Sequence, residues 1–283
     1  MVLESILKTE KLEDKPHQIV FGAILYIIVG TIATLLLSSF FGPEAISTLF
    51  IVLVAFPALP QILSLFFLAE MEKEKEMVLG STTLGRNYKL IMVLMLYFVT
   101  LIFGFTTVYL VIPQPQQAKI FSLQIKEVQT VTNVFTGKFT YQQKNTFEYV
   151  FENIFFHNMW VLLTMFLFSA VYGAGAVLTL AWNASVIGVF LANAGLSLLT
   201  KTGNIITGIT TSFLGILPHG IFEITGYCCA VLAGGLISVT IIKKAYNKPV
   251  FFDLSKDIAK ITALSIILIA VGALIETYAI TMA

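Results

Sequence analysis

Long apolar runs separated by short polar segments make up most of this chain of 283 residues. An α-helix needs about 20 predominantly apolar residues to cross a bilayer, whereas the helices and strands of a soluble core are shorter. Runs that meet or approach this length lie at residues 18–41, 45–69, 88–112, 156–181, 183–200, 219–242 and 261–280. The pattern predicts an all-α polytopic membrane protein with about six or seven transmembrane helices.

Prolines predict interruptions in two places. Pro57 and Pro60 lie inside the second run, and a kink or break is expected there because proline removes a helix hydrogen bond. Residues 205–217 are apolar but span only about 13 residues, too few to cross at a rise of 1.5 Å per residue. Because Pro218 follows, and proline is favoured in the first turn of a helix, we expect a re-entrant or broken helix near Pro218.

The runs divide the chain into three parts. Residues 1–113 form an N-terminal helical part with three spans, 114–155 an external polar segment, and 156–283 a membrane core. Alternation in residues 120–134 predicts a small extended or hairpin segment. Apolar residues at helical spacing in 147–156 predict an interfacial helix that lies on the membrane before the next span.

The positive-inside rule gives the chain an orientation, because Lys and Arg collect in cytoplasmic loops. The predicted cytoplasmic set is Lys8, Lys11, Lys15, Lys73, Lys75, Arg86, Lys89, Lys243, Lys244, Lys248, Lys256 and Lys260. The predicted external set is Lys119, Lys126, Lys138, Lys144 and Lys201. The N-terminus is therefore expected to be cytoplasmic and the C-terminus external, which requires residues 183–200 to cross. The Glu/Lys-rich residues 70–76 would form a solvated cytoplasmic loop.

Composition supports a multi-pass protein of the cell membrane and excludes a nucleic-acid binder. Hydrophobic residues make up 57% of the chain and charged residues 12%, whereas soluble domains carry about 25% charged residues. The net charge of +1 offers no surface for a polyanion. The two cysteines, Cys228 and Cys229, lie in an apolar run and are expected to be ordinary helix residues. The lipid bilayer is the first predicted partner.

The sequence L-P-H-G-I-F-E at residues 217–223 places ionisable side chains inside an apolar run. His219 and Glu223 are one helical turn apart, so a helix carries both on one face. Glu276 lies in the last span, and the predicted topology puts it at a membrane depth similar to that of His219 and Glu223. Ionisable groups at membrane depth are costly and usually mark a functional or paired site. With Asn158 and Asn183, these side chains form the candidate intramembrane polar cluster.

The chemistry of this cluster leaves three alternatives open. His219, Glu223 and Glu276 carry an imidazole and two carboxylates, which are suitable ligands for a divalent metal such as Zn²⁺. Alternatively, these side chains bond one another or backbone groups near Pro218, and their role is structural. A proton or substrate relay is the third alternative. Asn158, Asn183 and Asn193 are expected to hydrogen-bond between helices, as side-chain amides do in helical bundles. The catalytic residues stay unassigned.

At these residues the chain resembles the stage II sporulation protein M family of integral membrane proteins. The first half, which opens with two spans and a Glu/Lys-rich loop, resembles the archaeal-type relatives of this family. The most specific match is L-P-H-G-I-F-E, which is followed by A-G-G-L. The other blocks, F-F-H-N-M, A-W-N-A-S-V-I-G and L-I-E-T-Y-A-I-T, match in order and spacing, and together the blocks cover residues 147–281. The chain departs from the family in having Asn183-Ala184 where Asn-Gly is common.

The resemblance implies an integral membrane component without catalysis of its own. In sporulating bacteria the founding member of the family serves an engulfment complex that includes peptidoglycan-degrading partners. Our first hypothesis is accordingly a non-enzymatic scaffold or component of a membrane or envelope complex, with other membrane or envelope proteins, or a second copy of the chain, as partners. The alternatives are an intramembrane metal-dependent hydrolase that uses the His/Glu site, and a transporter or channel component suggested by the broken helix.

Overall fold

The computed structural model describes residues 17–76, 83–135, 146–244, 246 and 251–282, and every regular element within these residues is helical. The N-terminal half contains α2 (His17–Leu37), α3 (Pro43–Ala55), η2 (Phe56–Ala58), α4 (Leu59–Glu76), α5 (Thr83–Val111), α6 (Gln114–Ile120) and α7 (Ser122–Phe135). The C-terminal half contains α8 (Phe147–Tyr172), α9 (Ala176–Thr202), α10 (Ile205–Ile242) and α11 (Phe251–Met282).

Within the described residues, seven helical segments are long and apolar enough to cross a membrane, by length and composition. They are His17–Leu37, Pro43–Phe67, Asn87–Val111, Phe147–Tyr172, Ala176–Leu199, Ile205–Ile242 and Phe251–Met282. The prediction of an all-α polytopic membrane protein is therefore confirmed. The segment 183–200 belongs to one of these helices and is not a loop.

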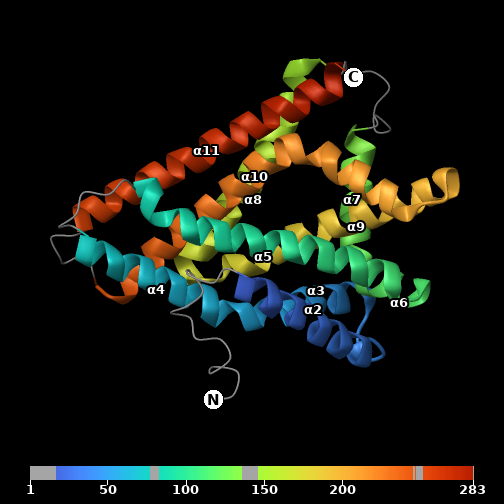
Figure 1. Ribbon diagram of the computed structural model, residues 1–283, viewed down its shortest axis with the longest axis horizontal. Coiled ribbons are helices and arrows are strands. Elements are labelled where there is room, and N and C mark those ends of the chain that lie inside the picture. The colour runs from blue at the N-terminus through green and yellow to red at the C-terminus, as the bar shows by residue number, and fades with distance from the viewer. Residues whose placement is uncertain (1–16, 77–82, 136–145, 245, 247–250, 283) are drawn as a thin grey trace.

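Helix α10 occupies the centre of the fold and contacts α4, α5, α8, α9 and α11 (Figure 1). Residues 226–236 of this helix form an unbroken stretch of buried positions. A helix that is apolar and buried on all sides is typical of the middle of a bundle. Helices α4, α5, α8, α9 and α11 therefore surround α10, whose side chains at these positions lie in the interior of the protein.

Small residues let the neighbouring helices approach α10 at backbone distance. A Cβ added at Gly234 would meet the carbonyl oxygen of Phe166 and lie 2.7 Å from the Cβ of Ser169, both on α8. A Cβ added at Gly226 would lie 3.1 Å from the carbonyl oxygen of Ser265 on α11. Close packing of this kind drives helix association in lipid, where apolar burial between helices gains little.

The N-terminal half has an aromatic core that reaches the polar segment after α5. Phe50 on α3 makes edge-to-face contacts with Phe105 on α5 and with Phe121, at centroid distances of 5.3 and 5.4 Å. Helix α7 is tied to α3 by the hydroxyl of Ser47, which donates to Oε1 of Gln124 at 2.7 Å. Helix α7 also contacts α9, so it lies across the bundle (Figure 1).

Of the two interruptions predicted at prolines, one is present in the structure and the other is not. The 3-10 turn η2 contains Pro57 and separates α3 from α4, which confirms the predicted kink in the second span. The predicted break at Pro218 is wrong, because residues 205–217 and the motif after them form one helix of 38 residues with Pro218 inside it. The parts of α10 before and after Pro218 both pack against neighbouring helices. The helix changes direction along its course instead of ending (Figure 1).

Other sequence-based boundaries are also corrected. Residues 120–134 belong to α6 and α7, with a turn at Phe121, and not to an extended hairpin; α6 packs on α3, and α7 packs on α3 and α9. Residues 147–156 are the first turns of α8 and not a separate interfacial helix. The span predicted at 156–181 divides at Gly173, whose φ of 63° lies in the left-handed region that glycine adopts readily. Residues 70–76 continue α4 as helix instead of forming a loop.

We expect Gly234→Ala to lower the stability of the protein in detergent micelles by about 1–3 kcal/mol, the usual cost of overpacking. The matched control is Gly215→Ala on the same helix, where an added Cβ meets no atom within 4 Å. Alanine favours a helix more than glycine does, so the control should leave stability unchanged or raise it slightly. The thermal unfolding midpoints of the two purified variants test this, and equal midpoints would contradict the packing argument.

Candidate functional site

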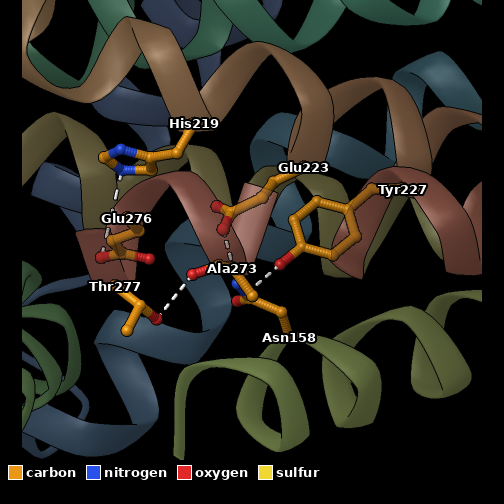
Figure 2. A network of polar contacts seen from close by, with 7 residues as sticks. All are labelled: Asn158, His219, Glu223, Tyr227, Ala273, Glu276 and Thr277. Atoms are coloured by element: carbon orange, nitrogen blue, oxygen red, sulfur yellow. Dashed lines mark hydrogen bonds and ion pairs between the residues drawn. The ribbon is translucent and has the colours of Figure 1, made fainter. Parts of the chain in front are cut away.

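A polar cluster lies where α8, α10 and α11 meet (Figure 2). On α10, His219, Glu223 and Tyr227 follow one another at intervals of four residues, so they share one face of the helix. Helix α8 supplies Asn158 and helix α11 supplies Glu276. Segments far apart in the sequence thus bring their polar side chains to one point in the membrane-spanning bundle.

A chain of hydrogen bonds joins α8 to α10 within the cluster. The phenol of Tyr227 donates to Oδ1 of Asn158 at 2.9 Å, and Nδ2 of Asn158 donates to Oε1 of Glu223 at 2.6 Å. Tyr227 and Asn158 are buried, with 6% and 8% of their surface exposed. The two bonds use both ends of the Asn158 amide, which fixes the orientation of the amide and of the carboxylate that it contacts.

The second connection runs from α10 to α11. Nε2 of His219 lies 4.0 Å from Oε1 of Glu276, and their side chains are 15% and 21% exposed. One potential ligand atom each from His219, Glu223 and Glu276 lies within 4.8 Å of the others. The structure thus brings these three side chains together with Asn158, which bonds directly to one of them.

Gly272 on α11 makes room for this arrangement. A Cβ added at Gly272 would lie 2.7 Å from Cγ of Glu223, 3.3 Å from Oε1 of Glu223 and 3.3 Å from the carbonyl oxygen of His219. The glycine therefore lets the backbone of α11 pass directly beside the Glu223 side chain. It also places Glu276, one turn further along α11, beside His219.

The cluster opens into a cavity of about 680 Å³ between α7, α8, α9, α10 and α11. Its apolar lining includes Ile187, Phe190 and Ile280, and Glu223, Glu276 and Tyr227 contribute polar surface from the cluster. Further polar side chains line the cavity from α7, α8 and α9, namely Glu127, Thr130, Asn153, His157 and Asn183. A mostly apolar hollow with a few converging polar groups is the usual form of a small-molecule site.

Asn158, Asn183 and Asn193, which the sequence predicts to bond between helices, have three different environments. Asn158 bonds across helices as expected. Asn193 also does so, because it accepts a hydrogen bond from the phenol of Tyr109 on α5 at 3.1 Å. Asn183 lines the cavity from α9, but its amide donates to the carbonyl of Thr179 in its own helix, so it does not join the cluster directly. Cys228 and Cys229 are buried free cysteines, as expected of ordinary helix residues.

Sequence reasoning missed two residues of the site. Tyr227 continues the four-residue spacing of His219 and Glu223, and extending that periodicity by one turn would have found it. Gly272 lies four residues before Glu276 in the last span, but no local pattern shows that it faces Glu223. Its importance follows only from the crossing of α10 and α11.

The residue types in the cluster restrict its chemistry. An imidazole and two carboxylates can bind a divalent cation, move a proton, or only join helices through hydrogen bonds. Among the described residues that line the cavity, none is a Ser or a Cys. The lining therefore provides no basis for catalysis by a Ser or Cys nucleophile.

Comparison with known proteins decides the family. The family model of Stage II sporulation protein M matches residues 91–280, which is more than half of the chain. This chain belongs to the stage II sporulation protein M family. An uncharacterized protein of Methanocaldococcus jannaschii is 32% identical over 134 residues, which cover 46% of this chain and 71% of the relative. No solved structure matches the chain.

The family match extends further towards the N-terminus than the motifs indicate. It begins within α5 and includes α6 and α7, whereas the motif resemblance begins near residue 147. Every residue of the polar cluster lies inside the matched segment. The Stage II sporulation protein M family therefore covers the complete site and the helices that form its cavity.

We expect Glu223→Ala to destabilise the protein by about 1–3 kcal/mol, because it leaves the buried amide of Asn158 without its acceptor. Glu223→Gln keeps an oxygen acceptor and the side-chain shape, so its unfolding midpoint should lie closer to that of the wild type. Glu127→Ala is the control, since Glu127 lines the same cavity from α7 but is not part of the cluster. Equal losses for the Ala and Gln variants at residue 223 would contradict this assignment.

Proposed function

We propose that this chain is a non-enzymatic, multi-span component of a membrane or envelope complex and serves as a scaffold for other proteins. The observation that supports this proposal most is the use of the buried polar groups to connect helices. The bonds from Tyr227 to Asn158 and from Asn158 to Glu223 join α8 to α10, and His219 approaches Glu276 on α11. A bundle connected in this way gives a stable base on which other proteins can assemble.

The surface proposed for docking is the layer formed by α6 and α7. One side of α7 packs on α3 and α9, whereas Lys126, Gln129 and Thr130 are exposed. Exposed polar side chains on a packed helix are suited to a polar protein surface and not to lipid tails. The family name also supports the proposal, because the word sporulation refers to a process of the cell and not to a reaction.

We further propose that the N-terminus is cytoplasmic and the C-terminus external. Seven crossings would place the ends of the chain on opposite sides of the membrane, and seven helices are long and apolar enough to cross. Lys243 and Lys244, which directly follow α10, and Lys256 and Lys260 in the first turns of α11 would lie on the cytoplasmic side under the positive-inside rule. Helix α7 would then be external, together with any partner that it holds.

Single-cysteine labelling tests the orientation. Lys126→Cys on α7 and Lys256→Cys on α11 are introduced separately into a chain that carries Cys228→Ala and Cys229→Ala, and Lys126 and Lys256 are exposed. In intact cells a membrane-impermeant maleimide should label the position on α7 only. After the membrane is opened, both positions should react. Labelling of both positions, or of Lys256→Cys only, in intact cells would refute the orientation.

Photo-crosslinking in the native membrane tests the scaffold. A photoreactive amino acid at Gln129 on α7 should yield a defined adduct with another protein, because that position faces away from the bundle. The control position is Val171 at the end of α8, which is 67% exposed and lies on a membrane-spanning helix, so it should yield mainly lipid adducts. Lipid adducts alone at both positions would count against the proposal.

An intramembrane metal-dependent hydrolase is the second candidate, and the cavity beside His219, Glu223 and Glu276 favours it. For a hydrolase, Glu223→Gln should fold and yet abolish product release from lipid or transmembrane-peptide substrates. For a scaffold, the same variant should keep the crosslink at Gln129. The continuous course of α10 removes the observation on which the transporter hypothesis depended.

A further inference from the structure

We propose that His219, Glu223 and Glu276 form a binding site for one divalent transition-metal ion of the Zn²⁺ class. This inference goes beyond the proposed scaffold, which requires no ion. It depends on four features of the site: the distances between the donor atoms, the charge of the site, the partners that orient Glu223, and the space beside the cluster.

The distances between donor atoms are close to those of a metal site. Nε2 of His219 and Oε1 of Glu276 are 4.0 Å apart, and one donor atom from each of the three residues lies within 4.8 Å of the others. Around a tetrahedral ion with bonds of about 2.0–2.2 Å, ligand atoms lie about 3.3–3.6 Å apart. At the widest separation of 4.8 Å a contraction of about 1.2–1.5 Å is therefore needed, and rotation about the flexible side-chain bonds of Glu223 and Glu276 can supply it.

The acidic side chains of the site favour binding of a cation. Two carboxylates lie close together in a mainly apolar part of the bundle, where their mutual repulsion is poorly screened. The described residues that line the cavity include neither Lys nor Arg. The carboxylates can therefore be neutralised by protons or by a bound cation, and the nearby imidazole of His219 supplies the additional ligand that a transition metal prefers.

The partners of Glu223 match those of a typical metal ligand. The amide of Asn158 donates to Oε1 of Glu223, and Tyr227 holds that amide in place. Ligating carboxylates are usually hydrogen-bonded by an outer shell of this kind, which fixes their orientation and supports metal affinity. Among the described residues, the hydrogen bond found at the Glu223 carboxylate involves Oε1, so Oε2 can face an ion.

The cavity provides the remaining coordination position. Three protein ligands with one open position are typical of zinc sites that bind water or an exchangeable ligand. The cavity of about 680 Å³ borders all three proposed ligands, so water or a small oxygen-containing ligand has room beside the ion. Binding would also connect α10 to α11, because His219 and Glu223 are on one helix and Glu276 is on the other.

Metal titration of the full-length chain in lipid nanodiscs tests the proposal. After treatment with a chelator, the protein is titrated with Zn²⁺ against a fluorescent competitor, and with Co²⁺ while its visible absorption is recorded. We expect one tightly bound ion per chain and a Co²⁺ spectrum in the range typical of nitrogen and oxygen ligands. His219→Ala, Glu223→Gln and Glu276→Gln should each weaken Zn²⁺ binding at least tenfold, and Asn158→Ala about 10–100-fold.

Two control variants match the ligands in residue type and location. His157→Ala and Glu127→Gln alter an imidazole and a carboxylate that line the same cavity but lie outside the group of three. Both controls should bind Zn²⁺ like the wild type. The conservative Gln variants at residues 223 and 276 keep the side-chain shape, and their circular dichroism and elution volumes verify the fold.

Three outcomes would overturn the metal site. One is a stripped wild-type protein that binds no ion. Another is binding that the three ligand variants retain in full, which would show an adventitious ion only. The third is an equal loss of binding in His157→Ala and His219→Ala. Any of these results would leave the scaffold proposal standing, because the crosslink at Gln129 does not depend on an ion.

Discussion

The close approach of α8 and α11 to α10 is the contact on which the other features of this protein depend. Gly234 lies against the backbone of α8, and Gly226 and Gly272 bring α10 and α11 together. In a bilayer, apolar side chains gain little by leaving lipid for protein, so helices associate where small residues allow dense packing. The same contacts determine which polar side chains can meet.

Because the helices approach so closely, the polar groups of the interior can satisfy one another. Ser169 on α8 donates to the carbonyl of Val231 on α10 at 2.6 Å, and Asn158 bonds to Glu223 two turns or more away along the same pair of helices. An unsatisfied polar group in hydrocarbon costs several kcal/mol. Asn158, Glu223 and Tyr227 therefore contribute to the stability of the helix pair as well as to the candidate site.

The unusual length of α10 brings different neighbours to different parts of this helix. Its 38 residues would measure about 57 Å as a straight helix, whereas the hydrocarbon core of a bilayer is about 30 Å thick. The helix carries Pro218 in its interior and changes direction (Figure 1). One part packs with α9 through Gly208, and the other packs with α8 and α11. The cavity lies between these neighbours and α7, and the residues of α10 that line it begin at Ile216, just before the proline, and end at Tyr227.

Local pattern indicated the helical class, about six or seven spans, the kink at Pro57 and the shared face of His219 and Glu223. Apolar run length and four-residue spacing are properties of the chain itself. Contacts between distant segments decided the rest. They made residues 120–134 helical on α3 and α9, kept α10 continuous through Pro218, and brought Glu276 and Gly272 to Glu223. A sequence records the preferences of each segment, whereas only the packed bundle determines which segments meet.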